Sequence, residues 1–131
     1  MAPPKADRSG SASQDVLTIT NNERGKAGCP ALTLDDRLTK AATDHSVDMA
    51  RNNYFSHTSQ DGRTFVERAK AAGYPNPGAE NIAKGQSTPE AVMDAWMKSA
   101  GHRENILNCG LKTMGLGLAT DGYYWTQLFG R

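Results

Sequence analysis

Three side chains in this sequence are of the types that metal binding or acid–base chemistry requires. They are His57, Glu80 and His102, which are separated by 23 and 22 positions. Two imidazoles and one carboxylate suit a divalent metal, zinc above all, with water in an open position. The same trio could instead orient the polar group of a ligand without any metal. No local metal motif such as HExxH is present, so the spacing alone does not decide between a metal site and a metal-free ligand site.

Each of these side chains also has a purely structural interpretation. His57 lies in a polar loop, where a histidine either faces a cleft or bonds to the loop itself. Glu80 could pair with a lysine or cap a backbone amide. Gly101 permits a sharp helix end, from which His102 could reach another element. His45 lies on an apolar helical face, and we interpret it as a buried structural residue bonded to the backbone.

The composition excludes several classes of protein. A chain of 131 residues is the size of one domain. Hydrophobic residues make up 37% of the chain and charged residues 22%. This composition is too apolar for a disordered chain and too polar for a membrane protein. The net charge of +1 lacks the basic excess expected of a protein that binds nucleic acid or an acidic membrane surface. Because the apolar runs are short, no transmembrane segment is predicted. A monomer is expected.

The sequence contains two cysteines, Cys29 and Cys109, without CxxC spacing. A zinc site made of cysteines is therefore not expected. The pair suits either one disulfide, which would imply an oxidising compartment, or two buried thiols. The apolar cluster at 16–19 is too short for a signal peptide. The chain is therefore either cytosolic or a mature fragment that begins with a new methionine.

The pattern predicts a leader, five helices and three strands. Residues 1–14 offer no apolar face and are expected to be a flexible leader, with the folded domain over 15–131. A first helix is expected over about 15–26. Thr33 is the expected N-cap of a second helix that ends near Asn53, and Leu34, Leu38, Ala41, Ala42, His45 and Met49 form its apolar face.

The remaining helices are predicted from capping boxes, and the strands from the change to alternating apolar residues near the C-terminus. Thr64 with Glu67 starts a helix that stops at Gly73, and Ser87 with Glu90 starts another. A short helix is expected over 102–107 and a strand over 80–84. The strands over 114–118 and 123–129 are joined by a two-residue turn at Asp121 and Gly122. Helices followed by an antiparallel hairpin indicate an α+β or layered α/β/α domain.

The sequence resembles the CAP superfamily, which comprises the cysteine-rich secretory proteins, antigen 5 and pathogenesis-related 1 proteins, in its compact bacterial SCP-like form. The likeness covers about 16–131, and its motifs come in the family's order. They are Asn21-x-x-Arg24, the helix from Leu34 to Ala50, the loop with His57, Gly78-Ala79-Glu80-Asn81-Ile82-Ala83, Trp96-x-x-Ser99-x-Gly101-His102-Arg103-x-Asn105, Gly115-x-Gly117 and Tyr124-Trp125-Thr126-Gln127.

The resemblance implies a three-layer α/β/α sandwich with a small, mainly antiparallel central sheet and a central cleft. In the family, two histidines and two glutamates line this cleft and can bind a divalent cation. By position they correspond to His57, Glu80 and His102, while Ser99 stands in place of the second glutamate. The expected cleft is therefore His57, Glu80, Ser99 and His102, and the expected metal ligands are His57, His102 and Glu80, with zinc preferred.

The resemblance also implies a secreted protein with a disulfide between Cys29 and Cys109, and a mature fragment. The family shares no single reaction, and eukaryotic relatives are linked to sterol and lipid binding. We therefore expect a secreted module that binds a small molecule, lipid or cell-envelope component, with no catalytic residue assigned. The alternatives are a metal-assisted hydrolase, with Glu80 as ligand or general base, and an extracellular scaffold that acts through its surface.

Overall fold

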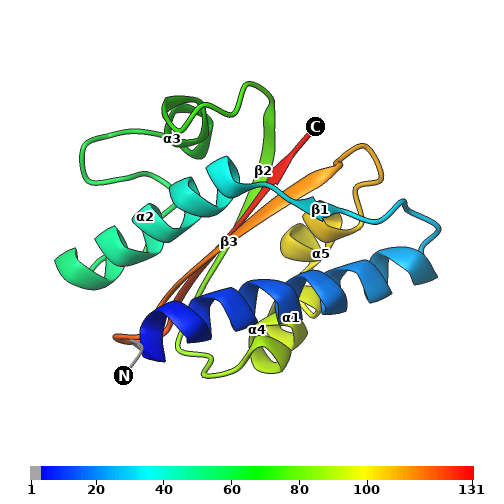
Figure 1. Cartoon of the computed structure of the whole chain (residues 1–131), viewed down its shortest axis with the longest axis horizontal. Coiled ribbons are helices and arrows are strands. Elements are labelled where there is room, and N and C mark those ends of the chain that lie inside the picture. Colours follow the sequence, from blue (N-terminus) through cyan, green and yellow to red (C-terminus); the bar gives the residue numbers. More distant parts are fainter. Residues whose placement is uncertain (1–3) are drawn as a thin grey trace.

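A computed structural model describes residues 4–131, and it shows a sheet covered by helices on both faces (Figure 1). The four strands are β1 (Thr33–Leu34), β2 (Pro77–Lys84), β3 (Thr113–Ala119) and β4 (Tyr124–Gly130). Their order in the sheet is β1-β3-β4-β2. β2 and β3 both run antiparallel to β4, whereas the short β1 runs parallel to β3. The sheet is therefore mixed, and mainly antiparallel as expected.

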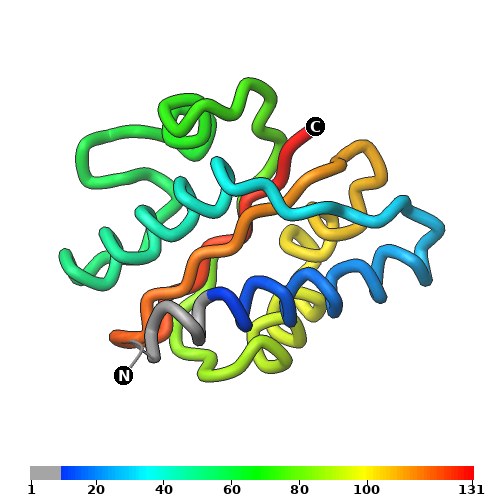
Figure 2. The backbone as a smooth tube through the Cα atoms, in the orientation of Figure 1, coloured from blue at the N-terminus to red at the C-terminus, as the bar shows by residue number. Residues whose placement is uncertain are grey.

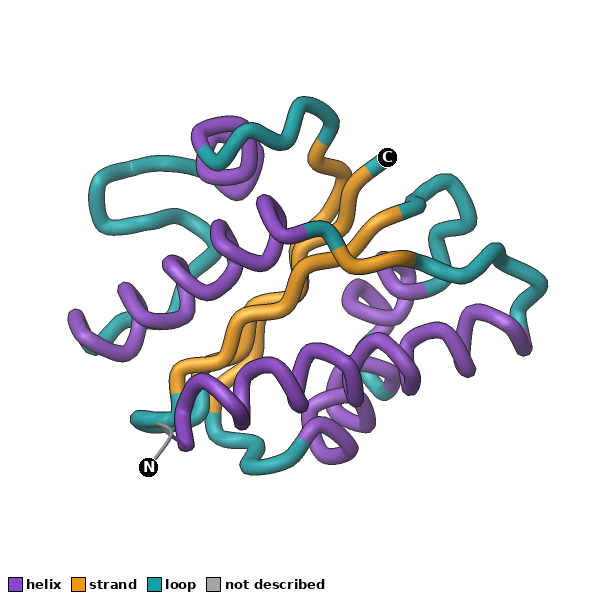
Figure 3. The backbone as a smooth tube through the Cα atoms, viewed as in Figure 1, coloured by secondary structure: helices purple, strands orange, loops and turns teal. Residues whose placement is uncertain are grey.

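The helices form the two outer layers. α2 (Asp36–Asn52) and α3 (Phe65–Ala71) cover one face of the sheet. α1 (Pro4–Lys26), α4 (Pro89–Met97) and α5 (Ala100–Ile106) cover the other (Figure 3). After α1 the chain turns back along the edge of the sheet through β1 and enters α2 (Figure 2). This arrangement confirms the predicted α/β/α sandwich.

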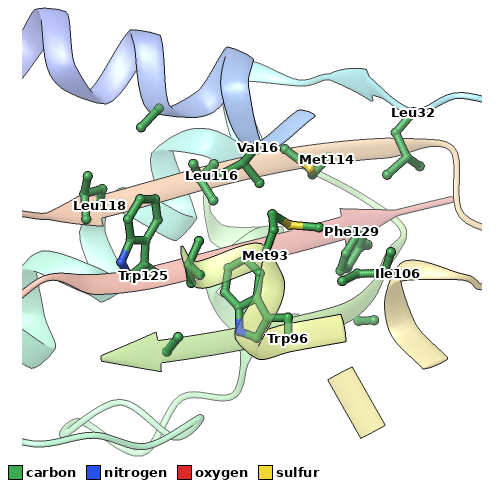
Figure 4. Packing of buried hydrophobic residues seen from close by; sticks show 14 of the residues in the cluster. Val16, Leu32, Met93, Trp96, Ile106, Met114, Leu116, Leu118, Trp125 and Phe129 are labelled. Atoms are coloured by element: carbon green, nitrogen blue, oxygen red, sulfur yellow. The ribbon is translucent and has the colours of Figure 1, made fainter. Parts of the chain in front are cut away.

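The core is divided between the two faces because side chains alternate along the strands. On the face of α1 and α4, Met114 and Leu116 of β3 pack with Trp125 and Phe129 of β4 (Figure 4). On the other face, Leu128 packs with Leu38 and Ala42 of α2 and with Ala69 of α3. The alternate positions of β3 that face α2 are Gly115 and Gly117, so the backbone of α2 lies directly on the strand.

The structure corrects the predicted leader over 1–14. Residues 1–3 lie outside the described residues, and the backbone is helical from Pro4, well before the expected start at about residue 15. The reason is a buried stripe at four-residue spacing, which begins at Ala12 and continues through Val16 and Thr20 to Arg24. Ala12 belongs to the main core cluster, so α1 packs against the core from Ala12 onward.

Local capping differs from expectation at two helices and agrees at one. The box of Thr64 and Glu67 caps α3 as predicted. The N-cap of α2 is Asp35, not Thr33, because Thr33 pairs with Thr113 in the sheet. The N-cap of α4 is Thr88 rather than Ser87.

The hairpin between β3 and β4 has a longer loop than predicted. Ala119 pairs with Tyr124, which leaves four residues between them instead of two. Gly122 and Tyr123 have φ values of 90° and 55°, so both adopt left-handed backbone. The predicted hairpin is confirmed, whereas the predicted two-residue turn is wrong.

A disulfide and a buried arginine join α1 to the segment that follows α5. Cys29 and Cys109 form a disulfide across a sequence separation of 80 residues. Beside it, the buried Arg24 guanidinium donates to four carbonyl oxygens, those of Pro30, Ile106, Asn108 and Leu111. Among the described residues, no helix combines the length and the apolar character that crossing a membrane requires.

Candidate functional site

The fold brings two of the three predicted chemical residues into direct contact. His57 lies in the loop between α2 and α3, and Glu80 lies on β2. The Nδ1 atom of His57 is 2.8 Å from Oε1 of Glu80. Because a carboxylate accepts hydrogen bonds, Nδ1 is the donor, and in the neutral form of the ring Nε2 is an acceptor. The His57 side chain is 57% exposed and that of Glu80 only 1%.

Arg68, on the inner face of α3, holds this pair in place. Its Nη1 donates to Oε2 of Glu80 at 2.9 Å, and its Nη2 donates to the carbonyl oxygen of His57 at 2.5 Å. The Arg68 side chain is 4% exposed, so the ion pair with Glu80 is buried. One guanidinium therefore fixes both the carboxylate that orients the imidazole and the backbone that carries it.

His102 lies at the start of α5 and has a different support. Its Nδ1 is 2.8 Å from the hydroxyl oxygen of Ser99. Ser99 is the N-cap residue of α5 but makes no side-chain capping bond, so its hydroxyl supports the imidazole instead. Burial, and secondarily the charge of nearby His57, lower the pKa of His102. His102 is thus a second imidazole held by a hydrogen bond, here from Ser99 at the start of α5.

A chain of side-chain amides, half-buried at Asn105 and buried at Asn81 and Gln127, ties α5 to the sheet at this point. Asn105 Nδ2 donates to Asn81 Oδ1 at 2.9 Å and to the carbonyl oxygen of Glu80 at 3.4 Å. Asn81 in turn donates to Gln127 on β4, and Gln127 donates to Thr20 on α1. These bonds set the distance of α5 from β2, and thereby the place of His102 relative to Glu80.

His57 and Glu80 line one side of an open groove with a volume of about 460 Å³. Phe65, Gly78 and Ala79 supply apolar wall, and the polar side chains of the lining are His57, Thr58, Thr64, Glu80 and Asn105. A volume of this size suits a small organic molecule. His102 is not among the lining residues, so the predicted hollow is shared by His57 and Glu80, with Asn105 on the side of α5.

The arrangement does not favour Glu80 as a metal ligand. Both of its oxygens already accept hydrogen bonds, one from His57 and one from Arg68. Across the described part of the chain, no three histidine, cysteine, aspartate or glutamate side chains are grouped to hold a metal ion. The three-ligand zinc site therefore does not fit the side chains as placed, and cation binding stays a prediction.

His45 has the structural role expected of it. It is buried on α2, and its Nε2 is 2.8 Å from the carbonyl oxygen of Ser56. Through this bond His45 holds the start of the loop that carries His57.

The sequence reasoning missed Arg68 and the role of Asn105. The sequence carries no local signal for Arg68, because the face of α3 on which it lies is defined only once the helix packs on β2. A basic residue on an inner helical face needs a buried acceptor, and Glu80 is that acceptor.

A model of the cysteine-rich secretory protein family, CAP, matches residues 17–129. The chain belongs to the CAP family. The three-layer fold, with its mixed four-stranded sheet, agrees with this membership.

Several relatives share the domain. The uncharacterized protein YkwD of Bacillus subtilis is 46% identical over 116 residues, which are 87% of this chain and 45% of YkwD. The uncharacterized membrane protein YlbC of the same organism is 34% identical over 88% of this chain and 33% of its own length. This CAP chain therefore spans less than half the length of the curated relatives it matches.

Solved structures show the same fold. An extracellular protein containing a SCP domain from Bacillus anthracis superposes with a TM-score of 0.89 and 34% identity, over 100% of this chain and 44% of that one. An outer surface protein of Borrelia burgdorferi superposes with a TM-score of 0.81 and 24% identity, over 98% of this chain and 95% of its own.

Proposed function

We propose that this CAP domain is a binding module whose groove takes a small molecule with an apolar body and a hydrogen-bond donor. The observation that carries the proposal is the exposed imidazole of His57, oriented by the buried pair of Glu80 and Arg68. A buried ion pair is costly to desolvate, and here it serves to present one ring nitrogen to the groove.

The chemistry of the lining selects the ligand class. With Nδ1 of His57 donating to Glu80, Nε2 offers a lone pair, so the matching ligand atom is an O–H or N–H donor. Phe65 and Ala79 supply the apolar wall beside it. A neutral amphiphile, such as an alcohol with an aromatic or alkyl body, satisfies both requirements, and lipids and cell-envelope components include such molecules.

The test compares two matched probes, benzyl alcohol and benzyl methyl ether, by NMR titration of the His57 and Phe65 ring signals. We expect saturable shifts with the alcohol and binding weaker by about 2- to 10-fold with the ether, which lacks the O–H donor. His57→Ala should weaken alcohol binding to the level of the ether. Lys26→Ala, an exposed change on α1, is the control and should bind as wild type.

Absence of shifts with both probes, or equal shifts in wild type and His57→Ala, would overturn the proposal. Calorimetry with Zn²⁺ alone addresses the cation. With Glu80 held by Arg68 and His57, only the two imidazoles remain as ligands, so we expect weak binding that is lost in His57→Ala.

A hydrolase is the second candidate, and one observation favours it. An imidazole whose Nδ1 is held by a buried carboxylate and whose Nε2 is free has the arrangement of a general base. Among the described contacts, Nε2 of His57 has no hydroxyl or thiol partner, so water would be the nucleophile. Hydrolysis of p-nitrophenyl acetate above background, abolished by Glu80→Gln, would support this candidate, and rates equal to background would reject it.

We also infer that the domain works outside the cytoplasm. The disulfide between Cys29 and Cys109 suits an oxidising compartment, and similar structures come from proteins described as extracellular or outer-surface. Thiol alkylation of protein taken directly from its source cells should find both cysteines oxidised. Alkylation of both thiols without prior reduction would contradict this location.

A further inference from the structure

The groove beside His57 contains a second polar residue, Asn105, to which the proposed function gives no role. Asn105 lies on α5, is half-buried and lines the groove. A side-chain amide has two different ends, an oxygen that accepts hydrogen bonds and an NH₂ group that donates them. What Asn105 offers to a ligand therefore depends on which of these ends is left unused by the protein.

The hydrogen bonds of Asn105 fix the orientation of its amide. Its Nδ2 donates to Asn81 Oδ1 at 2.9 Å and to the carbonyl oxygen of Glu80 at 3.4 Å. A backbone carbonyl only accepts, so the atom facing Glu80 is the amide nitrogen. The amide of Asn81 is fixed in the same way, because its Nδ2 donates to the carbonyl oxygen of His102 at 3.2 Å. Both N–H bonds of Asn105 are thus directed at β2, and Oδ1 is the unused end.

The Oδ1 atom of Asn105 is open to solvent. It accepts no hydrogen bond from a described residue, since both bonds of this side chain involve Nδ2. In the described part of the chain, the buried side-chain atoms without a partner are Nδ1 of His45, Nε of Arg68 and Oε1 of Gln86. Oδ1 of Asn105 is not one of these atoms, so it is accessible. Because Asn105 lines the groove, Oδ1 is the atom with which it meets a ligand.

The polar side chains of the groove therefore offer more acceptors than donors. Nδ1 of His57 is bonded to Glu80, which leaves Nε2 as an acceptor in the neutral ring. The Thr64 hydroxyl is used in the capping box of α3. Among the described lining side chains, only the exposed Thr58 hydroxyl can still donate. A ligand with two O–H donors matches Nε2 of His57 and Oδ1 of Asn105 together, whereas a carboxylate ligand, which only accepts, matches neither.

We propose that Asn105 is a specificity-determining residue of this groove, which takes a diol on an apolar body. The inference rests on the proposed function and narrows its ligand class from one donor to two. One hydroxyl donates to Nε2 of His57 and the other to Oδ1 of Asn105, while the apolar body lies on Phe65 and Ala79. The groove volume of about 460 Å³ has room for such a molecule.

The test compares 1-phenylethane-1,2-diol with 2-methoxy-1-phenylethanol, which keeps both oxygens but lacks one O–H donor. Affinities are measured by NMR titration of the His57 ring and the Asn105 side-chain amide at about pH 8, where imidazole is ordinarily neutral. We expect the wild type to bind the diol about 2- to 10-fold more tightly than the ether. Equal affinities would overturn this inference and leave the proposed function standing, because the ether retains one donor. Absence of binding by both molecules would overturn both proposals.

Variants of α5 separate recognition by Asn105 from a purely structural role. Asn105→Ala removes Oδ1, so it should lower the affinity for the diol to that for the ether and leave the affinity for the ether little changed. Equal weakening of both ligands would show that Asn105 only positions α5, and would overturn the inference. Glu104→Ala, an exposed change on the same helix, is the matched control and should bind both ligands as wild type. If Asn105→Ala does not fold, the comparison of the two ligands in the wild type still decides the proposal.

Discussion

The buried pair of Arg68 and Glu80 is the central residue-scale feature of this CAP domain. Its two side chains are 4% and 1% exposed, so neither charge is solvated. A buried charge without its partner is strongly destabilising, whereas replacing both members with apolar groups is often tolerated. The pair therefore contributes more to the position of His57 than to the stability of the fold.

The first prediction follows from this asymmetry. Glu80→Ala leaves the Arg68 guanidinium buried without its carboxylate, so we expect a loss of about 3–5 kcal/mol in the free energy of unfolding by urea. The double change Arg68→Met with Glu80→Met should cost clearly less than the sum of the two single changes. Additive losses would show that the pair does not act as a unit.

The second prediction concerns acid. The pKa values of His45 and His102 are both lowered from the usual 6.5, chiefly by burial. As the pH falls through 6.5, the unfolded chain takes up these two protons before the folded one does. Stability should therefore fall between about pH 7.5 and 5.5, as a lower urea midpoint.

The control for this pH effect removes both titrating groups. In His45→Gln with His102→Gln, the urea midpoint should vary less over the same range than in wild type. A wild-type midpoint that stays constant or rises on acidification would contradict the lowered pKa values.

At the scale of elements, local signals were sufficient where the deciding contacts are local. The box of Thr64 and Glu67 was predicted correctly because both its bonds lie within four residues. The N-cap of α2 was not, since pairing of Thr33 with Thr113 moves the helix start to Asp35. The early start of α1 was missed because Ala12 is too small to mark an apolar face, although it packs in the core.

The third prediction tests the close approach of α2 to the sheet. A Cβ at Gly115 would overlap the backbone of Leu38 and Thr39, and backbone cannot move aside as a side chain can. We expect Gly115→Ala to cost about 1–3 kcal/mol or more in thermal or urea unfolding. Gly101→Ala is the matched control, because nothing lies within 4 Å of its added Cβ in α5. It should stabilise by up to about 1 kcal/mol.

At the scale of the whole molecule, the sequence predicted part of the geometry of the candidate site. His57 and Glu80 were expected to meet, and they do. Arg68 was not foreseen, because nothing local links residue 68 to residue 80 before α3 packs on β2. His102 was expected in the same hollow, but α5 is held by Asn105 so that Asn105, rather than His102, lines the groove.

The fourth prediction concerns the corner closed by the disulfide. Cys29 and Cys109 close a loop of 80 residues, for which the chain-entropy model gives about 4–5 kcal/mol of stabilisation. The same corner is held by Arg24, which donates to the carbonyl oxygens of Pro30 and Asn108, each adjacent to a cysteine. We therefore expect the reduced protein to stay folded, with a lower melting temperature and a lower free energy of unfolding.

Cys29→Ser with Cys109→Ser should reproduce the effect of reductant and should itself be insensitive to it. Arg24→Met added to this variant also removes the hydrogen bonds from Arg24 to the carbonyl oxygens beside both cysteines. The combined loss in free energy of unfolding should exceed the loss from either change alone, because the disulfide and Arg24 restrain the same segments. A melting temperature unchanged by reductant in the wild type would show that the disulfide does not stabilise the fold. Complete unfolding on reduction would show that Arg24 and the core cannot maintain the fold without the disulfide.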